Sequence, residues 1–239
     1  MIHFRLPFRR SPIAQFHSFA YLRHTARRLE HLASLGLPIA GRTVLELGAG
    51  IGDHTHFFLD RGCSVVATDS RPENLAVLKR RYPTLRAELL DLEDPNRMPS
   101  EVFEVVHCYG LLYHLHDPAA ALRTIASLCS GILLLETCVS FGNALEIGRV
   151  REDARNPSQA SSGWGCRPTR PWILAQLREQ FPYVYTPHTQ PVHEEFPTDW
   201  TRPGVHGALL ARAVFIASRE PLSNAMLAEG IREQQQRQL

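Results

Sequence analysis

The stretch TVLELGAGIGDHT, residues 43–55, constrains the fold of this 239-residue chain more than any other. Val44, Leu45 and Leu47 form a short apolar run that is typical of a buried strand, and a cluster of glycines follows directly. Glycine suits such a turn because a side chain would keep the backbone away from a ligand and because the turn can require positive φ. A helix that begins there offers free backbone N–H groups to polar ligand atoms. The stretch therefore predicts a strand, turn and helix that bind a nucleotide.

Glu46, which lies just before these glycines, narrows the kind of ligand. A carboxylate there would crowd a pyrophosphate with negative charge, but it suits a ligand that carries a cationic amino-acid end. Together with the glycines, Glu46 resembles the first motif of the class I S-adenosylmethionine-dependent methyltransferases, which is a hydrophobic strand, an acidic residue and GxGxG. The resemblance implies S-adenosylmethionine as the cofactor, with contacts from Glu46, Gly48, Ala49, Gly50 and Gly52.

Length, charge and cysteine usage exclude several other classes of protein. A chain of 239 residues suits one α/β domain with an elaboration, or at most two small domains. It has no apolar run near the roughly 20 residues of a membrane-spanning helix and no signal-peptide pattern, so we expect a cytoplasmic protein without a membrane partner. The formal net charge of +2 gives no reason to expect nucleic acid. Five scattered cysteines without a CxxC pair predict buried thiols rather than disulfides or a zinc site.

Beyond the glycine turn, helix-like segments and apolar runs alternate as in an α/β protein. The pattern predicts helices over residues 53–61, 73–82, 119–129 and 170–181, and a frayed helix end from residue 229 onward. It predicts further strands over residues 63–68, 85–92, 102–108, 131–138, 183–186 and 208–218. In the resembled family the last two strands form an antiparallel hairpin. We therefore predict a doubly wound, mostly parallel, Rossmann-like sheet of seven strands with an antiparallel C-terminal hairpin.

The first 29 residues contain arginines but no Asp or Glu, which is typical of an organelle transit peptide. Against that, apolar residues recur at helical spacing as far as Leu35, and Gly36 follows as a helix stop. We prefer an amphipathic helix that belongs to the fold. In the resembled family a helix before the first motif often packs over the cofactor pocket, so residues 1–40 are expected to form a helical lid. The apolar positions are Phe16, Phe19, Leu22, Ala26, Leu29 and Leu32.

Two acidic residues at strand ends are expected to bind the adenosine part of the cofactor. Asp69 follows the glycine turn by close to 20 residues, which places a carboxylate at the tip of the neighbouring strand, where it can accept hydrogen bonds from both ribose hydroxyls. Ser70 is expected to contact the cofactor beside it. Alternatively, Asp69 only caps the following helix. The resemblance implies that Asp91 accepts from the adenine amine while the backbone N–H of Leu92 faces the ring; the alternative is a solvated acidic turn.

The segment YGLLYHLHDP, residues 109–118, resembles the fourth motif of small-molecule and tRNA-modifying methyltransferases. In open α/β sheets ligands lie outside the carboxyl ends of the strands, so this segment should border the methyl donor. Tyr109 is expected to bind the cofactor. Tyr113 and His114 are the candidates for catalysis. His114 has a suitable pKa for a general base, or it holds Asp117 as a structural residue.

Neither group of neighbouring histidines predicts a metal site. One group is His114, His116 and Asp117, and the other is His54 with His56. Both lack a third ligand at a recognised spacing, so we expect no metal.

The remainder of the chain is predicted from composition and position. Residues 41–140 form the cofactor-binding core, and residues 172–220 the last helix and hairpin. Residues 141–171 are irregular, but Trp164, Cys166 and the following Trp172 are unusual for a free linker, and the segment contains a cluster of arginines. It is expected to form either a substrate lid for an acidic or phosphorylated acceptor or a structural cover. His193 and Glu194 are weaker candidates for acceptor contacts. The arginines are Arg149, Arg151, Arg155, Arg167 and Arg170.

These observations favour a methyltransferase that acts on a small-molecule acceptor by O-methylation. The first alternative is an enzyme like those that modify the tRNA wobble uridine, which would bind RNA in a salt-sensitive way. A nicotinamide-dependent oxidoreductase shares the topology, but Glu46 beside the glycines and the lack of a recognisable Tyr/Lys or His/Asp set argue against it. A cofactor-binding scaffold without activity is the third alternative.

Overall fold

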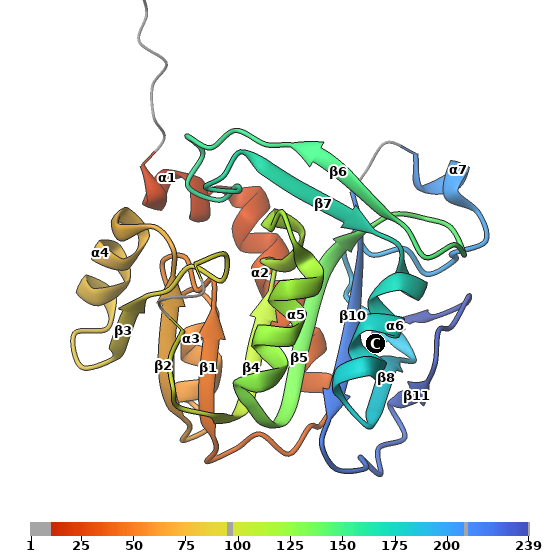
Figure 1. Cartoon of the computed structure of the whole chain (residues 1–239), viewed down its shortest axis with the longest axis horizontal. Helices are drawn as coiled ribbons and strands as arrows, with labels where there is room; N and C mark the ends of the chain where they lie inside the picture. The colour runs from red at the N-terminus through yellow and green to blue at the C-terminus, as the bar shows by residue number, and fades with distance from the viewer. Residues whose placement is uncertain (1–10, 95–97, 208–209, 239) are drawn as a thin grey trace, which may run out of the picture.

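The structure is a computed structural model that describes residues 11–94, 98–207 and 210–238 (Figure 1). Its main sheet contains eight strands, which are β1 (Thr43–Leu47), β2 (Ser64–Asp69), β3 (Arg86–Leu89), β4 (Phe103–Tyr109), β5 (Cys129–Val139), β8 (Tyr183–Pro187), β10 (Ala211–Ser218) and β11 (Leu227–Glu229). Two short sheets pair β6 (Ile147–Arg151) with β7 (Trp164–Pro168) and β9 (Thr189–Gln190) with β12 (Gln236–Arg237). The helices are α1 (Pro12–Phe16), α2 (Phe19–Ser34), α3 (Thr55–Leu59), α4 (Pro72–Arg81), the 3₁₀ turn η2 (Leu112–His114), α5 (Pro118–Ser127), α6 (Arg170–Gln180) and α7 (Pro203–His206).

The strand order of the main sheet is β11-β8-β10-β5-β4-β1-β2-β3. Strands β1 to β5 are parallel to one another, β10 is antiparallel to both β5 and β8, and β11 is antiparallel to β8. The predicted mostly parallel α/β fold is confirmed, with β11 as a strand beyond the seven predicted. Strands β8 and β10 are antiparallel neighbours, but the long segment 188–210 joins them, so they do not form a tight hairpin.

Helices cover both faces of this sheet, which explains why its central strands are apolar throughout. Along β5, Leu133 and Leu135 pack into the cluster beneath α5 and α6, whereas Ile132 and Leu134 pack into the cluster beneath α2 and α3. Alternate residues of a strand point to opposite faces, so a strand buried on both sides needs apolar residues at every position. In Figure 1, α5 and α6 lie in front of the sheet.

The N-terminal helix forms, but its buried face differs from the predicted one. The chain forms α1 and α2, with a break between Phe16 and Phe19. Phe19 is 83% exposed and Leu22 is 44% exposed, although both belong to the predicted apolar face. Leu29 and Leu32 of the predicted face are buried, but the buried face of α2 also carries four polar residues, His24, Thr25, Arg28 and His31. These polar residues have polar partners in the interior: Arg28 donates to Glu136 of β5, and His31 contacts Thr189 of β9. The first ten residues of the predicted lid lie outside the described residues.

Two other segments differ from the sequence-based expectation. Within the predicted irregular segment 141–171, β6 and β7 form an antiparallel ribbon. The frayed helix predicted from residue 229 is wrong, because Gln236 and Arg237 pair with β9 as an extended strand. Of the predicted strand 208–218, residues 208–209 lie outside the described residues. No helix in the described part of the chain has both the length and the apolar character needed to cross a bilayer.

Candidate functional site

The glycine turn after β1 adopts backbone conformations that favour glycine. Gly48, Gly50 and Gly52 have φ values of 64°, 58° and 84°. A Cβ atom on Gly48 would lie 3.2 Å from the side chain of Leu111, and one on Gly50 would lie 3.0 Å from the ring of Phe16. The turn can therefore form only where side chains are absent, as the sequence predicted, and α1 closes directly over it.

Asp69, at the end of β2, is bonded to this turn. Its Oδ2 accepts a hydrogen bond from the backbone N–H of Gly50 at 2.8 Å, and its Oδ1 accepts from the N–H of Arg71 and from Nδ2 of Asn74 at 2.9 and 3.1 Å. Burial raises the pKa of Asp69 to about 6, although these donors oppose that effect. The N-cap residue of α4 is Arg71, so Asp69 is not itself the N-cap; its carboxylate joins the glycine turn to the start of α4.

A cavity that is partly open to solvent lies beside Asp69. The predicted residues Gly48, Asp69, Ser70, Asp91 and Leu92 line it, together with His114. Asp91 also accepts a hydrogen bond from the N–H of Glu93 at 3.0 Å, so it both lines the cavity and stabilises its own turn. The opposite wall consists of Phe16, Tyr21 and residues 157–161.

A second, smaller cavity meets the first at Gly48 and Gly110. It contains the predicted Glu46, Ala49 and Tyr109. Glu46 accepts a hydrogen bond from the hydroxyl of Thr55 at 2.6 Å, and burial raises the pKa of Glu46 to about 8. Gly50 and Gly52, which were also expected to contact the cofactor, line neither cavity. A Cβ on Gly52 would lie 2.8 Å from the ring of Tyr82, so this glycine serves packing.

Five buried polar atoms around the second cavity have no hydrogen-bond partner in the described structure. A buried polar atom without a partner costs free energy, so such a group indicates a place for a polar ligand. Atoms of both donor and acceptor type are present, which suits a ligand that carries both an ammonium and a carboxylate group. The atoms are Arg28 Nε, Asp53 Oδ2, His54 Nε2, His107 Nδ1 and the Tyr109 hydroxyl.

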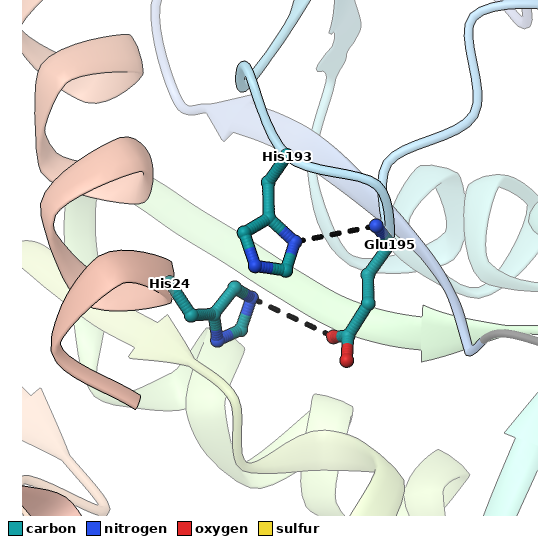
Figure 2. Close-up of side chains that lie close together, drawn as sticks. All are labelled: His24, His193 and Glu195. Atoms are coloured by element: carbon teal, nitrogen blue, oxygen red, sulfur yellow. Dashed lines mark hydrogen bonds and ion pairs between the residues drawn. The ribbon is translucent and has the colours of Figure 1, made fainter. Parts of the chain in front are cut away.

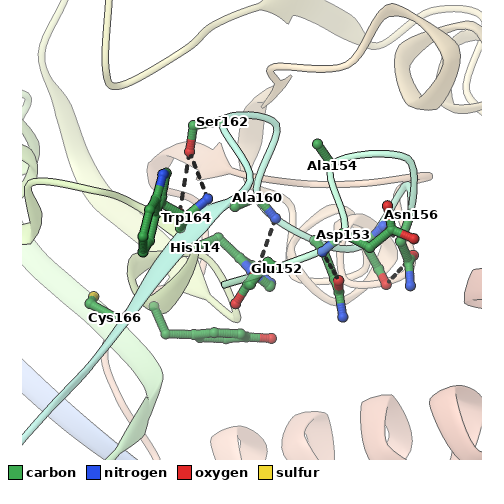
Figure 3. Close-up of polar contacts among 12 residues, drawn as sticks. His114, Glu152, Asp153, Ala154, Asn156, Ala160, Ser162, Trp164 and Cys166 are labelled. Carbon is green, nitrogen blue, oxygen red and sulfur yellow. Dashed lines mark hydrogen bonds and ion pairs between the residues drawn. The ribbon is translucent and has the colours of Figure 1, made fainter. Parts of the chain in front are cut away.

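His114 contacts a carboxylate that the sequence analysis did not identify. Its Nδ1 forms a short hydrogen bond with Oε2 of Glu152, which follows β6 (Figure 3). Tyr113, the other catalytic candidate, lines neither cavity. Its hydroxyl accepts a hydrogen bond from Nη2 of Arg212 at 3.1 Å. The structure therefore brings His114, but not Tyr113, to the wall of the cavity.

The histidines that were considered as metal ligands have other partners. Asp117 accepts from the N–H of Ala120 as the N-cap of α5, and His116 Nε2 lies 3.2 Å from Nη1 of Arg149. His54 contacts His107 rather than His56, with 3.0 Å between His54 Nδ1 and His107 Nε2. This contact could not be predicted from the sequence, because His107 lies on β4, 53 positions along the chain from His54.

His24, His193 and Glu195 form a second polar cluster, where α2 meets the segment after β9 (Figure 2). Nδ1 of His193 accepts from the N–H of Glu195 at 3.2 Å, and Nε2 of His24 lies 3.8 Å from Oε2 of Glu195. Arg212 donates to the same carboxylate at 2.6 Å. Burial and then the charge of Arg28 keep the pKa of His24 far below its ordinary value. These neutral histidines and bound guanidinium groups hold α2 in place and suit a cation poorly.

The arginines of segment 141–171 do not converge on either cavity. Arg155 pairs with Asp153, Arg167 contacts Glu152, and Arg170 stacks over a tryptophan ring. Glu194, a candidate for acceptor contacts, instead pairs with Arg23 near the surface. The expected recognition of an acidic acceptor by this cluster finds no support in these contacts.

Comparisons with known proteins agree with this site. A family model described as a methyltransferase domain matches residues 18–189. The chain is similar to an uncharacterized methyltransferase of Mycobacterium tuberculosis, with 39% identity over 90 residues that cover 38% of this chain and 36% of that protein. It is also similar to the tRNA U34 carboxymethyltransferase of Dichelobacter nodosus, with 32% identity over 134 residues that cover 53% of this chain and 42% of that protein. The chain therefore matches less than half the length of these curated relatives.

In fold, the chain is similar to the N-terminal domain of EvdMO1, crystallised in the presence of SAH and D-fucose. The TM-score is 0.61 and the sequence identity 21%, over 82% of this chain and 83% of that chain. At this identity the likeness concerns the fold alone.

Proposed function

Because the chain belongs to the methyltransferase domain family, we propose that it transfers a methyl group from S-adenosylmethionine to an oxygen atom of a small-molecule acceptor. The observation that carries this proposal is the pair of cavities that meet at Gly48 and Gly110, one beside Asp69 and the other surrounded by unpartnered polar atoms. A ligand with a nucleoside at one end and a zwitterionic amino acid at the other fits both. S-adenosylmethionine has these two ends, and when bound it would supply a methyl group on a sulfonium.

The residues fit the two ends by chemical type. Asp69 and Asp91 would bind the ribose and the adenine amine, and the glycine turn leaves room for close approach. In the second cavity, Asp53 and Glu46 would face the ammonium group, and Arg28 would face the carboxylate. Alignment and exclusion of water are the main requirements for methyl transfer from a sulfonium, and α1 with residues 157–161 covers the first cavity.

A small acceptor is favoured because Phe16 and residues 157–161 line the first cavity and narrow the space that is left for an acceptor beside the cofactor. Oxygen is favoured because His114 lines the same cavity and can take a proton from a hydroxyl. We assign residues 11–40 and 152–161 the role of lids over bound S-adenosylmethionine.

Calorimetric titration with S-adenosylhomocysteine tests the proposal. We expect the wild type to bind it and NADH not to bind. Asp69→Ala removes the ribose acceptor, and Gly48→Asp places a side chain in the turn, so both variants should lose binding. Asp60→Ala, an exposed residue at the end of α3, is the matched control and should bind normally. Binding of NADH, or no binding to the wild type, would overturn the proposal.

A second candidate is modification of tRNA, which the similarity to the Dichelobacter nodosus enzyme favours. Fluorescence anisotropy with labelled tRNA distinguishes the two. Binding that weakens steeply between low and moderate salt would support RNA as the acceptor, whereas the absence of binding supports a small molecule.

A further inference from the structure

We propose that Glu152 is a positioning residue, which fixes His114 in the form that accepts a proton from the acceptor's hydroxyl. This inference rests on the proposed function and deepens it, because a built-in base implies an acceptor with a proton to remove, such as an alcohol, a phenol or an enol.

The contact between the two side chains determines which nitrogen of His114 carries hydrogen. Nδ1 of His114 faces Oε2 of Glu152, and an ionised carboxylate can only accept hydrogen bonds. Nδ1 must therefore carry the hydrogen and donate it. In a neutral imidazole this leaves Nε2 without hydrogen, with a free lone pair. His114 lines the first cavity, so its lone pair is available at the site where the acceptor would react.

Glu152 is fixed by other contacts besides that with His114. Its side chain is 4% exposed, and it accepts from the N–H of Ala160 at 2.8 Å and contacts Nη2 of Arg167 at 3.4 Å. Burial would raise the pKa of Glu152, but the hydrogen bond from His114 and the other contacts bring it below its ordinary value, so Glu152 is ionised at neutral pH.

His114 itself is neutral at neutral pH. Burial lowers its pKa, Glu152 raises it, and the nearby Arg212 and Arg167 lower it, with a net decrease. A neutral imidazole is the form that can accept a proton. The carboxylate beside it then stabilises the imidazolium that results.

The ribbon that carries Glu152 is packed directly on the turn that carries His114. A Cβ atom on Gly165 of β7 would lie 2.5 Å from the carbonyl oxygen of Tyr113 and 2.7 Å from Oε1 of Glu152. Arg167 Nη1 also donates to the carbonyl of Tyr113 at 3.3 Å. Since only glycine allows this approach, the two segments hold one another in register, and Glu152 and His114 meet as a fixed pair.

The chemical step balances with these groups. The acceptor's O–H proton moves to Nε2 of His114 as the acceptor oxygen forms a bond to the methyl carbon. The carbon–sulfur bond breaks and its electron pair stays on sulfur, which becomes a neutral thioether. His114 ends as an imidazolium beside the Glu152 carboxylate and later returns its proton to solvent.

Nitrogen NMR of the full chain labelled with ¹⁵N-histidine tests this inference without knowledge of the acceptor. The chain has 12 histidines, and His114→Gln identifies the signals of His114 by their loss. We expect Nδ1 to carry hydrogen and Nε2 to be free of it at neutral pH. In Glu152→Gln the protonation midpoint of His114 should move to lower pH by about one unit or more, because an adjacent negative charge is lost.

Asp153→Asn is the matched control, because Asp153 is the next residue and its carboxylate pairs with the exposed Arg155. It should leave the midpoint unchanged. Glu152→Asp, which keeps the charge but withdraws it from Nδ1, provides a second variant if Glu152→Gln does not fold. An Nε2–H form in the wild type, or shifts no larger than in Asp153→Asn, would overturn the inference. Titration of the same samples with S-adenosylhomocysteine separates the two proposals, since its failure overturns the proposed function alone.

Discussion

Arg28 on α2 and Glu136 on β5 form an ion pair in the interior of the protein. Nη1 of Arg28 donates to Oε2 of Glu136 at 3.0 Å, and the side chains are 5% and 0% exposed. Arg212 on β10 donates to the other carboxylate oxygen, also at 3.0 Å. The Glu136 carboxylate therefore joins α2 and β10 to β5 beside the two cavities.

Replacement of Glu136 by Gln should destabilise the protein strongly. It leaves two buried guanidinium groups without their shared anion, and loss of one partner from a buried ion pair costs about 3 to 5 kcal/mol. Urea denaturation measures the change in free energy of unfolding. Glu88→Gln, which removes an exposed partner of Arg86, is the control and should change stability little. Equal denaturation midpoints for the two variants would contradict this prediction.

Glu46 should make stability fall as pH rises. Burial raises its folded-state pKa from an ordinary 4.5 to about 8, so between these values the unfolded chain releases a proton that the folded protein retains. Its contribution is present below about pH 4.5 and decreases by up to about 1.4 kcal/mol per pH unit through this window. Glu46→Gln lacks the group, so its free energy of unfolding should fall less between pH 5 and pH 8. Parallel pH profiles for the two proteins would be inconsistent with this assignment.

Arg71 should control how fast a ligand dissociates from the first cavity. Its Nη2 donates to the carbonyls of Ala154 and Gln159 at 3.0 and 2.9 Å, which fastens the covering segment to the end of β2. Arg71→Ala removes both bonds and should speed dissociation of S-adenosylhomocysteine by about threefold to tenfold, as measured by stopped-flow fluorescence. Arg80→Ala, at an exposed position of α4, is the control. An unchanged rate in Arg71→Ala would show that the cover is held by other contacts.

The five cysteines should be unreactive in the folded protein. All are free and buried, as the sequence predicted, and burial raises the pKa of four of them to between about 11 and about 12. Because the thiolate is the reactive form, Ellman's reagent should label the native protein slowly and release five equivalents only after denaturation. Rapid labelling of the native protein would disprove this expectation.

Much of the site could be predicted because local motifs specify it. The turn at Gly48 and Gly50 needs positive φ, and Asp69 reaches it because adjacent parallel strands end at the same edge. The contacts of Arg28 with Glu136 and of His114 with Glu152 could not be predicted, because they join residues 108 and 38 positions apart and depend on how α2 and the ribbon pack.

The ribbon and the C-terminal strand were missed for a different reason. Strand β6 is almost entirely exposed, so its sequence has no alternation of apolar and polar residues to reveal it. The polar segment around Gln236 is extended because β9 provides hydrogen-bond partners, not because of its own propensity.

The cluster of Arg28, Glu136 and Arg212 also determines when the protein can fold during its synthesis. The strand that carries Arg212 leaves the ribosome roughly 180 residues after helix α2, which takes on the order of 10 to 40 s at ordinary translation rates. Until then the ion-pair cluster of Arg28 and Glu136 lacks Arg212. We therefore expect the nascent chain to expose α2 to chaperones and proteases until the strand that carries Arg212 has been made.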